Sequence, residues 1–158
     1  MRKKIPKKSG FTFFLISLCV VLLDQLVKFF VRNSMNIEDS IPVIKNIFHI
    51  TYIINSGAGF GIMQDKTSLL IWFAIIVIGI ILFYYDKIQE KKSLQIFSGL
   101  ILGGTISNLT DRLLFGFVTD FLDFRIWPVF NIGDSCVCIG AVFLIIYFIK
   151  KKNHKNFI

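Results

Sequence analysis

Residues 67–85 read TSLLIWFAIIVIGIILFYY, and this run contains no charged side chain. A bilayer core of about 30 Å is crossed by roughly 20 residues of α-helix. The run is therefore long enough and apolar enough to predict a transmembrane helix. Similar runs occur at about 11–31, 93–114 and 134–149, the last of them the shortest. The chain is thus predicted to contain four transmembrane helices.

The composition indicates that lipid surrounds much of the chain. Of the 158 residues, 54% are hydrophobic, whereas a typical soluble domain has roughly 45–50%. The excess is concentrated in the four runs, so we expect one integral membrane domain over residues 1–158. Gly99 and Gly103 lie four residues apart in the third run, a spacing that favours close packing between membrane helices.

The basic residues predict the orientation of the helices. Most Lys and Arg residues fall in three clusters beside the apolar runs, at Arg2–Lys8, Lys87–Lys92 and Lys150–Lys155. Positive charge beside a membrane span marks its cytoplasmic end. Both termini are therefore expected in the cytoplasm, and the loops 32–66 and 115–133 at the outer face. This orientation explains the net charge of +8, so nucleic acid is not an expected partner.

The two outer loops predict a small β-sheet. Residues 41–54 read IPVIKNIFHITYII, which is rich in β-branched and aromatic side chains and favours short strands. The run Asn55–Gly61 follows, and its glycines let the backbone turn sharply. The stretch VTDFLDF at 118–124 suggests a second short strand pair. The predicted fold class is an all-α membrane protein, a four-helix bundle with a small β-sheet cradle on its outer face.

Ionisable side chains gather at the predicted outer face. Asp24 and Lys28 lie four residues apart near the outer end of the first helix, so they share a helix face and are expected to form a salt bridge. Asn108 and Arg112 share a face of the third helix in the same way. Eight acidic residues are predicted on this side: Asp24, Glu38, Asp39, Asp65, Asp111, Asp120, Asp123 and Asp134.

The cysteines and histidines do not suggest a metal site. Cys19, Cys136 and Cys138 lie in or beside apolar runs and have the character of core residues. His49 and His154 are predicted on opposite sides of the membrane. Neither a metal ion nor another cofactor is therefore expected.

Among hydrolytic mechanisms, the residues favour paired carboxylates over an activated serine. None of Ser56, Ser107 and Ser135 has a neighbouring histidine. Lys28 would be a poor base because Asp24 should keep it charged. Two carboxylates that are held close together share one proton. One of them can then activate a water molecule while the other protonates the leaving group.

The aspartates around the last apolar run are open to two interpretations. Asp120 and Asp123 lie in the second outer loop, and Asp134 opens the fourth helix. A carboxylate at a helix N-terminus caps backbone amides and complements the helix dipole. Capping is thus the simpler explanation of Asp134 from its position alone, and a catalytic role is the alternative.

Five short motifs lie at the outer side of the predicted bundle. They are DQLVK at 24–28, NSGAGFG at 55–61, NLTDR at 108–112, GFVTDF at 116–121 and FNIGDS at 130–135. In this order they resemble those of the lipoprotein signal peptidases, also called signal peptidase II, and the similarity extends over almost the whole chain.

The resemblance implies roles for individual residues. Asp120 and Asp134 match the catalytic pair of this aspartyl endopeptidase family, whose four-helix fold with an outer β-cradle agrees with the prediction above. Ser107 and Gly133 depart from it, since they stand where the family usually has Gly and Ala. The positions that match its site-supporting and substrate-binding residues are Asp24, Lys28, Asn55, Gly57, Asn108, Arg112 and Asn131.

The resemblance also implies a substrate and a location. The family cuts a prolipoprotein just before a cysteine that already bears diacylglycerol, and the cyclic peptide globomycin inhibits it. The expected location is the bacterial cytoplasmic membrane, with several spans and the active site at the outer face. The expected partners are the diacylglyceryl-modified prolipoprotein and membrane lipid, and a monomer is expected. Such an amphiphilic substrate could enter sideways between helices.

Two other functions are compatible with the pattern. A small transporter or channel would explain charged residues within membrane helices, although here these residues crowd at one end instead of lying at several depths. A non-catalytic binder of lipidated peptides, or an inactive paralogue, would keep the fold and lose turnover.

Overall fold

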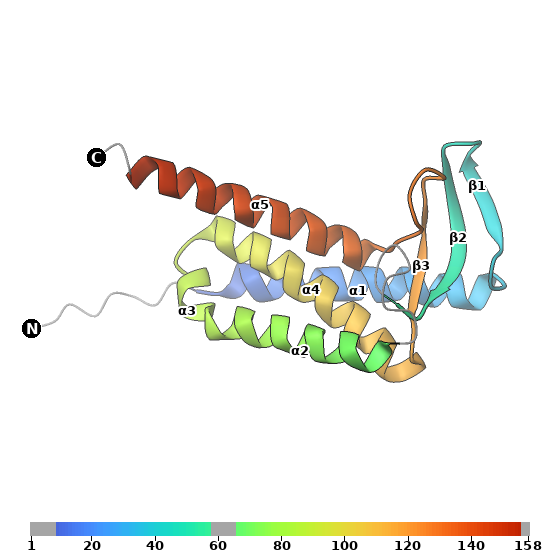
Figure 1. Ribbon diagram of the computed structural model, residues 1–158, viewed down its shortest axis with the longest axis horizontal. Coiled ribbons are helices and arrows are strands. Elements are labelled where there is room, and N and C mark those ends of the chain that lie inside the picture. Colours follow the sequence, from blue (N-terminus) through green and yellow to red (C-terminus); the bar gives the residue numbers. More distant parts are fainter. Residues whose placement is uncertain (1–8, 58–65, 156–158) are drawn as a thin grey trace, which may run out of the picture.

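The computed structural model describes residues 9–57 and 66–155. Long helices run along the molecule, and a small sheet lies across one end (Figure 1). The basic cluster Arg2–Lys8 and most of the glycine-rich run 55–61 lie outside the described residues. The elements are α1 (Phe11–Ser34), β1 (Ser40–Ile44), β2 (Phe48–Asn55), α2 (Thr67–Phe83), α3 (Tyr85–Ile88), α4 (Lys92–Phe115), β3 (Val118–Asp123) and α5 (Ile132–Lys155).

Helix α4 is the centre of the bundle and packs against α1, α5 and α2. Glycines allow this close approach. A Cβ atom added to Gly103 would lie 2.7 Å from the backbone oxygen of Ser17 in α1, and Gly99 faces the same helix at similarly close range. The predicted packing face of Gly99 and Gly103 is therefore confirmed. Gly104 faces the other way, against the backbone of Gly133 in α5.

The outward sides of the helices are strongly apolar. Helix α2 buries only Ala74 and Ile81, while Trp72 and Phe73 are more than half exposed. Apolar surface on this scale indicates a lipid or protein partner rather than water. Within the described residues, α1 and the Ile132–Lys152 part of α5 are long and apolar enough to cross a membrane, and α2 is a shorter apolar helix.

The sheet is antiparallel, with strand order β1-β2-β3. Strand β3 follows directly after α4, and its Asp120 pairs with Ile53 of β2. Val31 of α1 packs in one buried cluster with Tyr52 of β2 and Phe121 of β3. This contact attaches the sheet to the bundle and places Asp120 beside the helix ends.

Several helix ends differ from the prediction. The fourth helix, expected to be the shortest, has 24 residues, whereas α2 has 17. That expectation was wrong because the helix begins two residues earlier, at Ile132, and continues six residues past Ile149, to Lys155. The first helix continues to Ser34, and the separate short helix α3 connects α2 to α4.

The second outer loop contains one strand instead of the expected strand pair. Strand β3 pairs with β2, and the segment after it returns only in an isolated bridge between Leu122 and Phe130. Pro128 lies within the returning segment and has no backbone N–H to donate, which disfavours a second full strand there.

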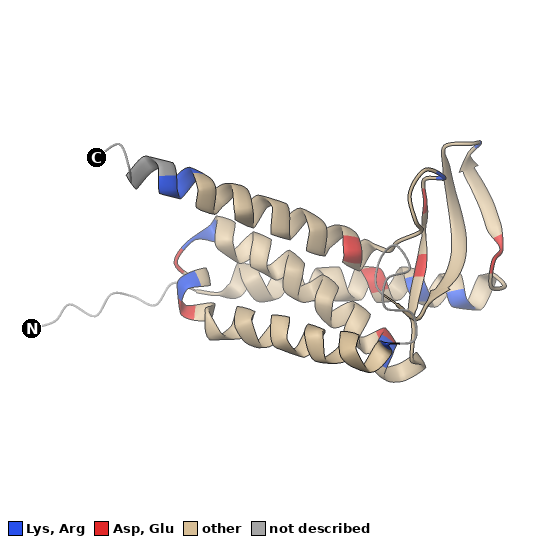
Figure 2. Ribbon diagram, in the orientation of Figure 1, with Lys and Arg blue, Asp and Glu red and all other residues tan. Residues whose placement is uncertain are grey.

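Charged side chains lie mainly at the two ends of the bundle (Figure 2). The basic residues of 87–92 and 150–152 share the end away from the sheet. Asp86 and Glu90 lie at that end too, and the other described acidic residues lie near the sheet. The middle of the bundle is left almost free of charge, as a lipid environment favours.

Candidate active site

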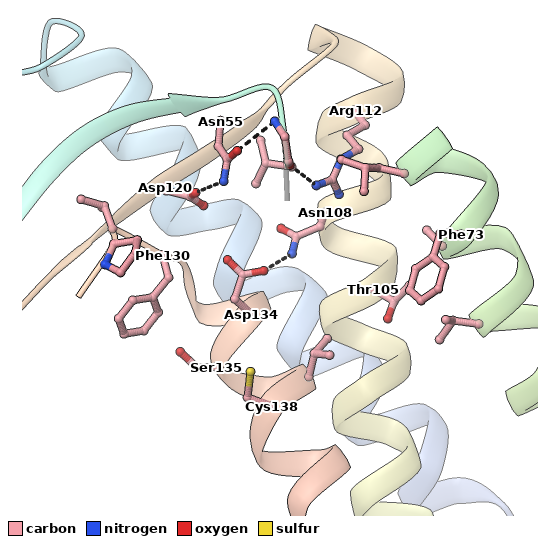
Figure 3. Close-up of a pocket in the computed structure, with 18 of the residues that line it drawn as sticks. Asn55, Phe73, Thr105, Asn108, Arg112, Asp120, Phe130, Asp134, Ser135 and Cys138 are labelled. Carbon is pink, nitrogen blue, oxygen red and sulfur yellow. Dashed lines mark hydrogen bonds between the residues drawn. The ribbon is translucent and has the colours of Figure 1, made fainter. Parts of the chain in front are cut away.

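A cavity of about 610 Å³ opens where the sheet meets the helices. Its volume is within the range of roughly 300–1,000 Å³ that is typical of ligand sites. Asp120 enters it from β3 and Asp134 from the first turn of α5, and Figure 3 shows both carboxylates pointing to the same region. Two aspartates that are separated in sequence therefore face one cavity.

The carboxylate of Asp120 is held by two side-chain amides. Asn55 donates from Nδ2 to its Oδ2 at 2.8 Å, and Asn131 donates from Nδ2 to its Oδ1 at 2.7 Å. Asp120 is only 1% exposed. Both oxygens are thus oriented by neutral donors, and no described cation forms an ion pair with them.

Burial has a large effect on the acidity of this group. It raises the pKa of the Asp120 carboxyl to about 7, and the nearby charge of Asp134 acts in the same direction. Hydrogen bonds from Asn55 and Asn131 and the charge of Lys28 act the other way but are outweighed. Asp120 therefore titrates near neutral pH and can hold a proton while a neighbouring carboxylate is ionised.

Asp134 serves two purposes through its two oxygens. The backbone N–H of Asn131 donates to its Oδ2 at 3.3 Å, and its own backbone N–H donates to Oδ1 of Asn131 at 2.8 Å. This reciprocal pair is a capping box at the start of α5. Its other oxygen, Oδ1, accepts from Nδ2 of Asn108 at 2.8 Å within the cavity. The capping interpretation of Asp134 is therefore correct, and it leaves one oxygen facing the site.

Asn131 connects the two aspartates. Its Nδ2 donates to Asp120 while its Oδ1 accepts from the backbone of Asp134. Because Asn131 is fully buried, its amide has little freedom to turn. One side chain thus fixes the position of β3 relative to the first turn of α5.

A buried lysine orients the asparagine on the other side of the cavity. Lys28 is 0% exposed, and its Nζ lies 2.7 Å from Asp24, 3.1 Å from Asp111 and 2.8 Å from Oδ1 of Asn108. An ammonium group only donates, so the atom of Asn108 that it meets must be the oxygen. The amide nitrogen of Asn108 is therefore directed to Asp134.

The predicted salt bridge between Asp24 and Lys28 is confirmed, and it is one part of a larger network. Ser107 donates to Asp24 at 2.6 Å, and the backbone N–H of Gly133 donates to Asp24 at 3.0 Å. Asp24 on α1 thereby reaches both α4 and the residue that precedes Asp134. Ser107, one of the departures from the family pattern, adds a donor to this buried carboxylate.

Asp111 is a buried member of this network that was not among the predicted site residues. It pairs with Lys28 and accepts from Gln25 Nε2 at 2.9 Å and from the backbone N–H of Thr119 at 3.1 Å. The last bond holds β3 one residue before Asp120. The signal was present in the sequence, since Asp111 lies three residues after Asn108 and shares its helix face.

Arg112 extends the site toward the end of β2. Its guanidinium donates to the backbone oxygen of Gly57 at 3.1 Å, and Gly57 donates from its N–H to Asn55 at 3.0 Å. The Nε atom of Arg112 is buried and has no hydrogen-bond partner among the described residues. Arg112 lines the same cavity as the aspartates, so it can supply a donor to a bound molecule.

The nine predicted site residues therefore lie in one connected region. Asp120, Asp134, Asn55, Gly57, Asn108 and Arg112 line the cavity, whereas Asp24, Lys28 and Asn131 act from behind it through hydrogen bonds. No group of three metal-binding side chains occurs in the part of the chain that the structure describes.

The remainder of the cavity is mostly apolar, with Thr105 and Ser135 as polar exceptions. Its surface runs from the aspartates along α2 and α5, away from the sheet. Both helices pack against α4, whereas contacts between α2 and α5 are sparse. The residues on this side are Leu70, Phe73, Ala74, Val77, Val137 and Cys138.

Comparison with known proteins gives consistent matches. A family model described as signal peptidase (SPase) II matches residues 16–150. A lipoprotein signal peptidase of Halothermothrix orenii is 48% identical over 134 residues, covering 85% of this chain and 92% of that protein. One of Moorella thermoacetica is 42% identical over 133 residues, covering 84% and 89%.

Solved structures are similar as well. A bacterial membrane enzyme determined by the in meso method at 2.3 Å resolution superposes with a TM-score of 0.87 at 34% identity, covering 91% of each chain. A second, determined at 1.9 Å, superposes with a TM-score of 0.81 at 35% identity, covering 88% of this chain and 93% of that one. The mostly helical fold with its small sheet is thus that of a membrane-embedded enzyme.

Proposed function

This chain belongs to the signal peptidase II family, and we propose that it removes signal peptides from prolipoproteins by aspartic proteolysis at Asp120 and Asp134. The observation that carries the proposal is the position of Asn131, which is hydrogen-bonded to both aspartates at the edge of one cavity. Two carboxylates so placed can share one proton, which is the requirement for this chemistry.

The reaction needs one proton donor and one proton acceptor. The ionised carboxylate removes a proton from a water molecule, whose oxygen attacks the scissile carbonyl carbon. The protonated carboxyl then donates to the leaving nitrogen as the C–N bond breaks, and the other aspartate retains the proton taken from water. The raised pKa of Asp120 suits it to the proton-donating role at neutral pH.

The asparagines and Arg112 position the reacting groups. Asn55 and Asn131 orient Asp120, and Asn108 orients Asp134. The unpaired Nε of Arg112 would donate to a carbonyl of the bound peptide. Lys28 and Asp24 do not touch the substrate, and they hold Asn108 and the start of α5 in place.

The substrate is a prolipoprotein with a diacylglyceryl-modified cysteine. The polar end of the cavity would hold the peptide at the aspartates, and its apolar side along α2 and α5 would hold a hydrocarbon part of the substrate. The sparse packing between α2 and α5 supports entry from the lipid, sideways between these two helices. Globomycin would bind in the same cavity.

The chain acts as a monomer of four membrane spans in the bacterial cytoplasmic membrane. Helices α1, α2, α4 and α5 form the spans. Both termini are cytoplasmic because the basic clusters at 87–92 and 150–152 lie at the end away from the sheet. The aspartates then lie at the outer face, where a lipid-anchored scissile bond would be held.

The test is cleavage of a purified lipidated prolipoprotein by the purified protein, followed by the gel shift of the product. Cleavage that globomycin blocks, and that requires the lipid on the cysteine, would support the proposal. Binding of globomycin without cleavage would indicate an inactive paralogue, and cleavage of the unmodified precursor at equal rate would contradict the substrate assignment.

A further inference from the structure

The segment between β3 and α5 forms one wall of the cavity. It leaves the strand after Asp123 and returns at Phe130, whose N–H donates to the oxygen of Leu122 at 3.1 Å. The N–H of Leu122 donates back to the oxygen of Phe130 at 2.7 Å. We call residues 124–130 the wall loop. Its residues on the cavity are Trp127, Pro128, Val129 and Phe130.

The first turn of the wall loop has an unusual backbone conformation. Arg125 has φ of 65°, in the left-handed region that residues other than glycine seldom adopt. Such a conformation needs local interactions that compensate for it. Here the carboxylate of Asp123 supplies them, since it accepts from the backbone N–H of Arg125 at 2.8 Å and from its guanidinium at 2.9 Å.

Asp123 also connects this turn to the sheet. Thr51 of β2 donates from Oγ1 to Oδ2 of Asp123 at 2.8 Å. The hydroxyl oxygen of Ser40, in β1, is hydrogen-bonded to Thr51 Oγ1 at 2.8 Å. Asp123 itself is only 5% exposed. The buried carboxylate of Asp123 therefore ties the base of the wall loop to β2 directly, and to β1 only through Thr51.

Asp123 does not reach the reacting groups. It is three positions after Asp120 on one strand, and side chains an odd number of positions apart point to opposite faces of a sheet. Asp120 lines the cavity and Asp123 does not. Any effect of Asp123 on the reaction must therefore pass through the wall loop.

We propose that Asp123 is a positioning residue that holds the wall loop in place as part of the substrate-binding surface. This inference rests on the proposed function. When the carboxylate of Asp123 is removed, Arg125 loses the acceptors that stabilise its left-handed turn. The wall loop, which bears Trp127, then moves away from the cavity. Substrate binding weakens while the aspartate pair remains assembled, because Asn55, Asn108 and Asn131 are bonded independently of Asp123.

The first experiment compares steady-state cleavage of a lipidated prolipoprotein by the unchanged full chain and by three variants of it. Asp123→Leu has a similar size but no acceptor, so we expect KM to rise about tenfold with kcat within twofold of the unchanged protein. Asp123→Asn keeps an acceptor oxygen for the N–H of Arg125 and should restore KM to within threefold. Asp39→Leu is the matched control, because Asp39 caps an exposed turn at Asn36 away from the cavity, and its KM should not change.

A second substitution makes the test specific to the turn. Glycine adopts positive φ without strain, so Arg125→Gly added to Asp123→Leu should recover most of the lost affinity. An unchanged KM in Asp123→Leu, a loss confined to kcat, or failure of Arg125→Gly to rescue would each overturn the proposal.

A fluorescence measurement keeps this test separate from that of the proposed function. The chain has two tryptophans, so Trp72→Phe leaves Trp127 of the wall loop as the only one. In that background Asp123→Leu should lower the anisotropy of Trp127, and Arg125→Gly should restore it. If the unchanged protein does not cleave prolipoprotein, the proposed function fails while this readout still tests the loop. An unaltered anisotropy would refute the positioning role.

Discussion

The side-chain amide of Asn131 lies 2.7 Å from Oδ1 of Asp120. This contact joins the turn before α5 to strand β3, and the same amide accepts from the backbone of Asp134. The two proposed catalytic aspartates are therefore held by a neutral side chain that belongs to neither. The predictions below follow from this arrangement and from the buried network behind it.

Removing the amide of Asn131 should reduce turnover while leaving the aspartates in the chain. Asn131→Ala frees Asp120 and weakens the cap of α5, and a displacement of about 1 Å at a reacting group can cost on the order of 10²-fold in rate. We expect kcat for prolipoprotein cleavage to fall by about that factor. Asn33→Ala is the control, since among the described residues Asn33 donates only to the backbone of Phe29, on the exposed side of α1. A normal kcat in Asn131→Ala would show that the aspartates are held without it.

The rate of cleavage should depend on pH through Asp120. The pKa of its carboxyl is raised to about 7, and the pair needs one proton to act. Cleavage should therefore decline as the pH rises through about 7. Asn55 stabilises the charged form of Asp120 through its hydrogen bond, so Asn55→Leu should move this decline to higher pH. A profile of kcat measured between pH 5 and about 9 tests both points. If the decline occurs at the same pH in Asn55→Leu as in the unchanged protein, Asn55 does not influence the pKa of Asp120.

Because of the Asp120 carboxyl, the free energy of unfolding should decrease as the pH rises. Asp120 has a higher pKa in the folded chain than its ordinary value of 3.8, so the folded state holds a proton that the unfolded state has lost between those two pKa values. Stability then falls with rising pH across that window. Thermal unfolding in detergent should show a smaller pH dependence between 4 and about 7 in Asp120→Asn than in the unchanged protein.

Lys28 should be needed for stability as well as for activity. Lys28→Met leaves Asp24 buried without its cation and Asp111 with only its longer ion pair to Arg32, at 3.5 Å. Breaking a buried ion pair in this way typically costs about 3–5 kcal/mol. We expect a large fall in the free energy of unfolding in detergent. Lys45→Met, at an exposed position of the β1–β2 turn, should change it by less than about 0.5 kcal/mol. Equal stability of the two variants would show that the network is not required for folding.

The contact between α4 and α5 should be sensitive to side-chain size. A Cβ atom at Gly104 would collide with the backbone of Gly133, next to Asp134. Gly104→Val should therefore separate these helices, destabilise the fold by about 1–3 kcal/mol and impair cleavage. Gly79→Val on α2 is a matched control, because nothing lies within 4 Å of the corresponding position. A variant at Gly104 that is as active as the one at Gly79 would contradict the packing described.

The sequence was sufficient for features that depend on local spacing. Asp24 and Lys28 are one helical turn apart, so their ion pair could be predicted and is present at 2.7 Å. The apolar runs located the long helices, although the fourth was expected to start at Asp134 because Ile132 and Gly133 were counted with the loop. The proposed catalytic pair rests on the family resemblance, since spacing alone does not distinguish a catalytic Asp134 from a capping one.

Features that depend on long-range contacts could not be read from spacing. The pairing of Ile53 with Asp120 requires the register between two separated loops. The spacing of Asp111 to Asn108 indicated which helix face it occupies, but its hydrogen-bond partners in α1 and β3 could not be predicted from spacing. The wall loop was expected to form part of a strand pair, and Pro128 together with the turn at Arg125 gives it a different path. These contacts depend on how distant segments of the chain pack together in the folded structure.

The most direct test of the proposed chemistry is single-turnover cleavage of a lipidated prolipoprotein by Asp120→Asn and by Asp134→Asn. Asp86→Asn is the control, since Asp86 lies at the opposite end of the bundle and accepts only from Gln89 among the described residues. We expect each of the first two variants to remain folded and bind substrate, but to cleave about 10²–10⁴-fold more slowly, while the control cleaves normally. Cleavage at an undiminished rate by either variant would contradict a shared-proton mechanism at these two aspartates.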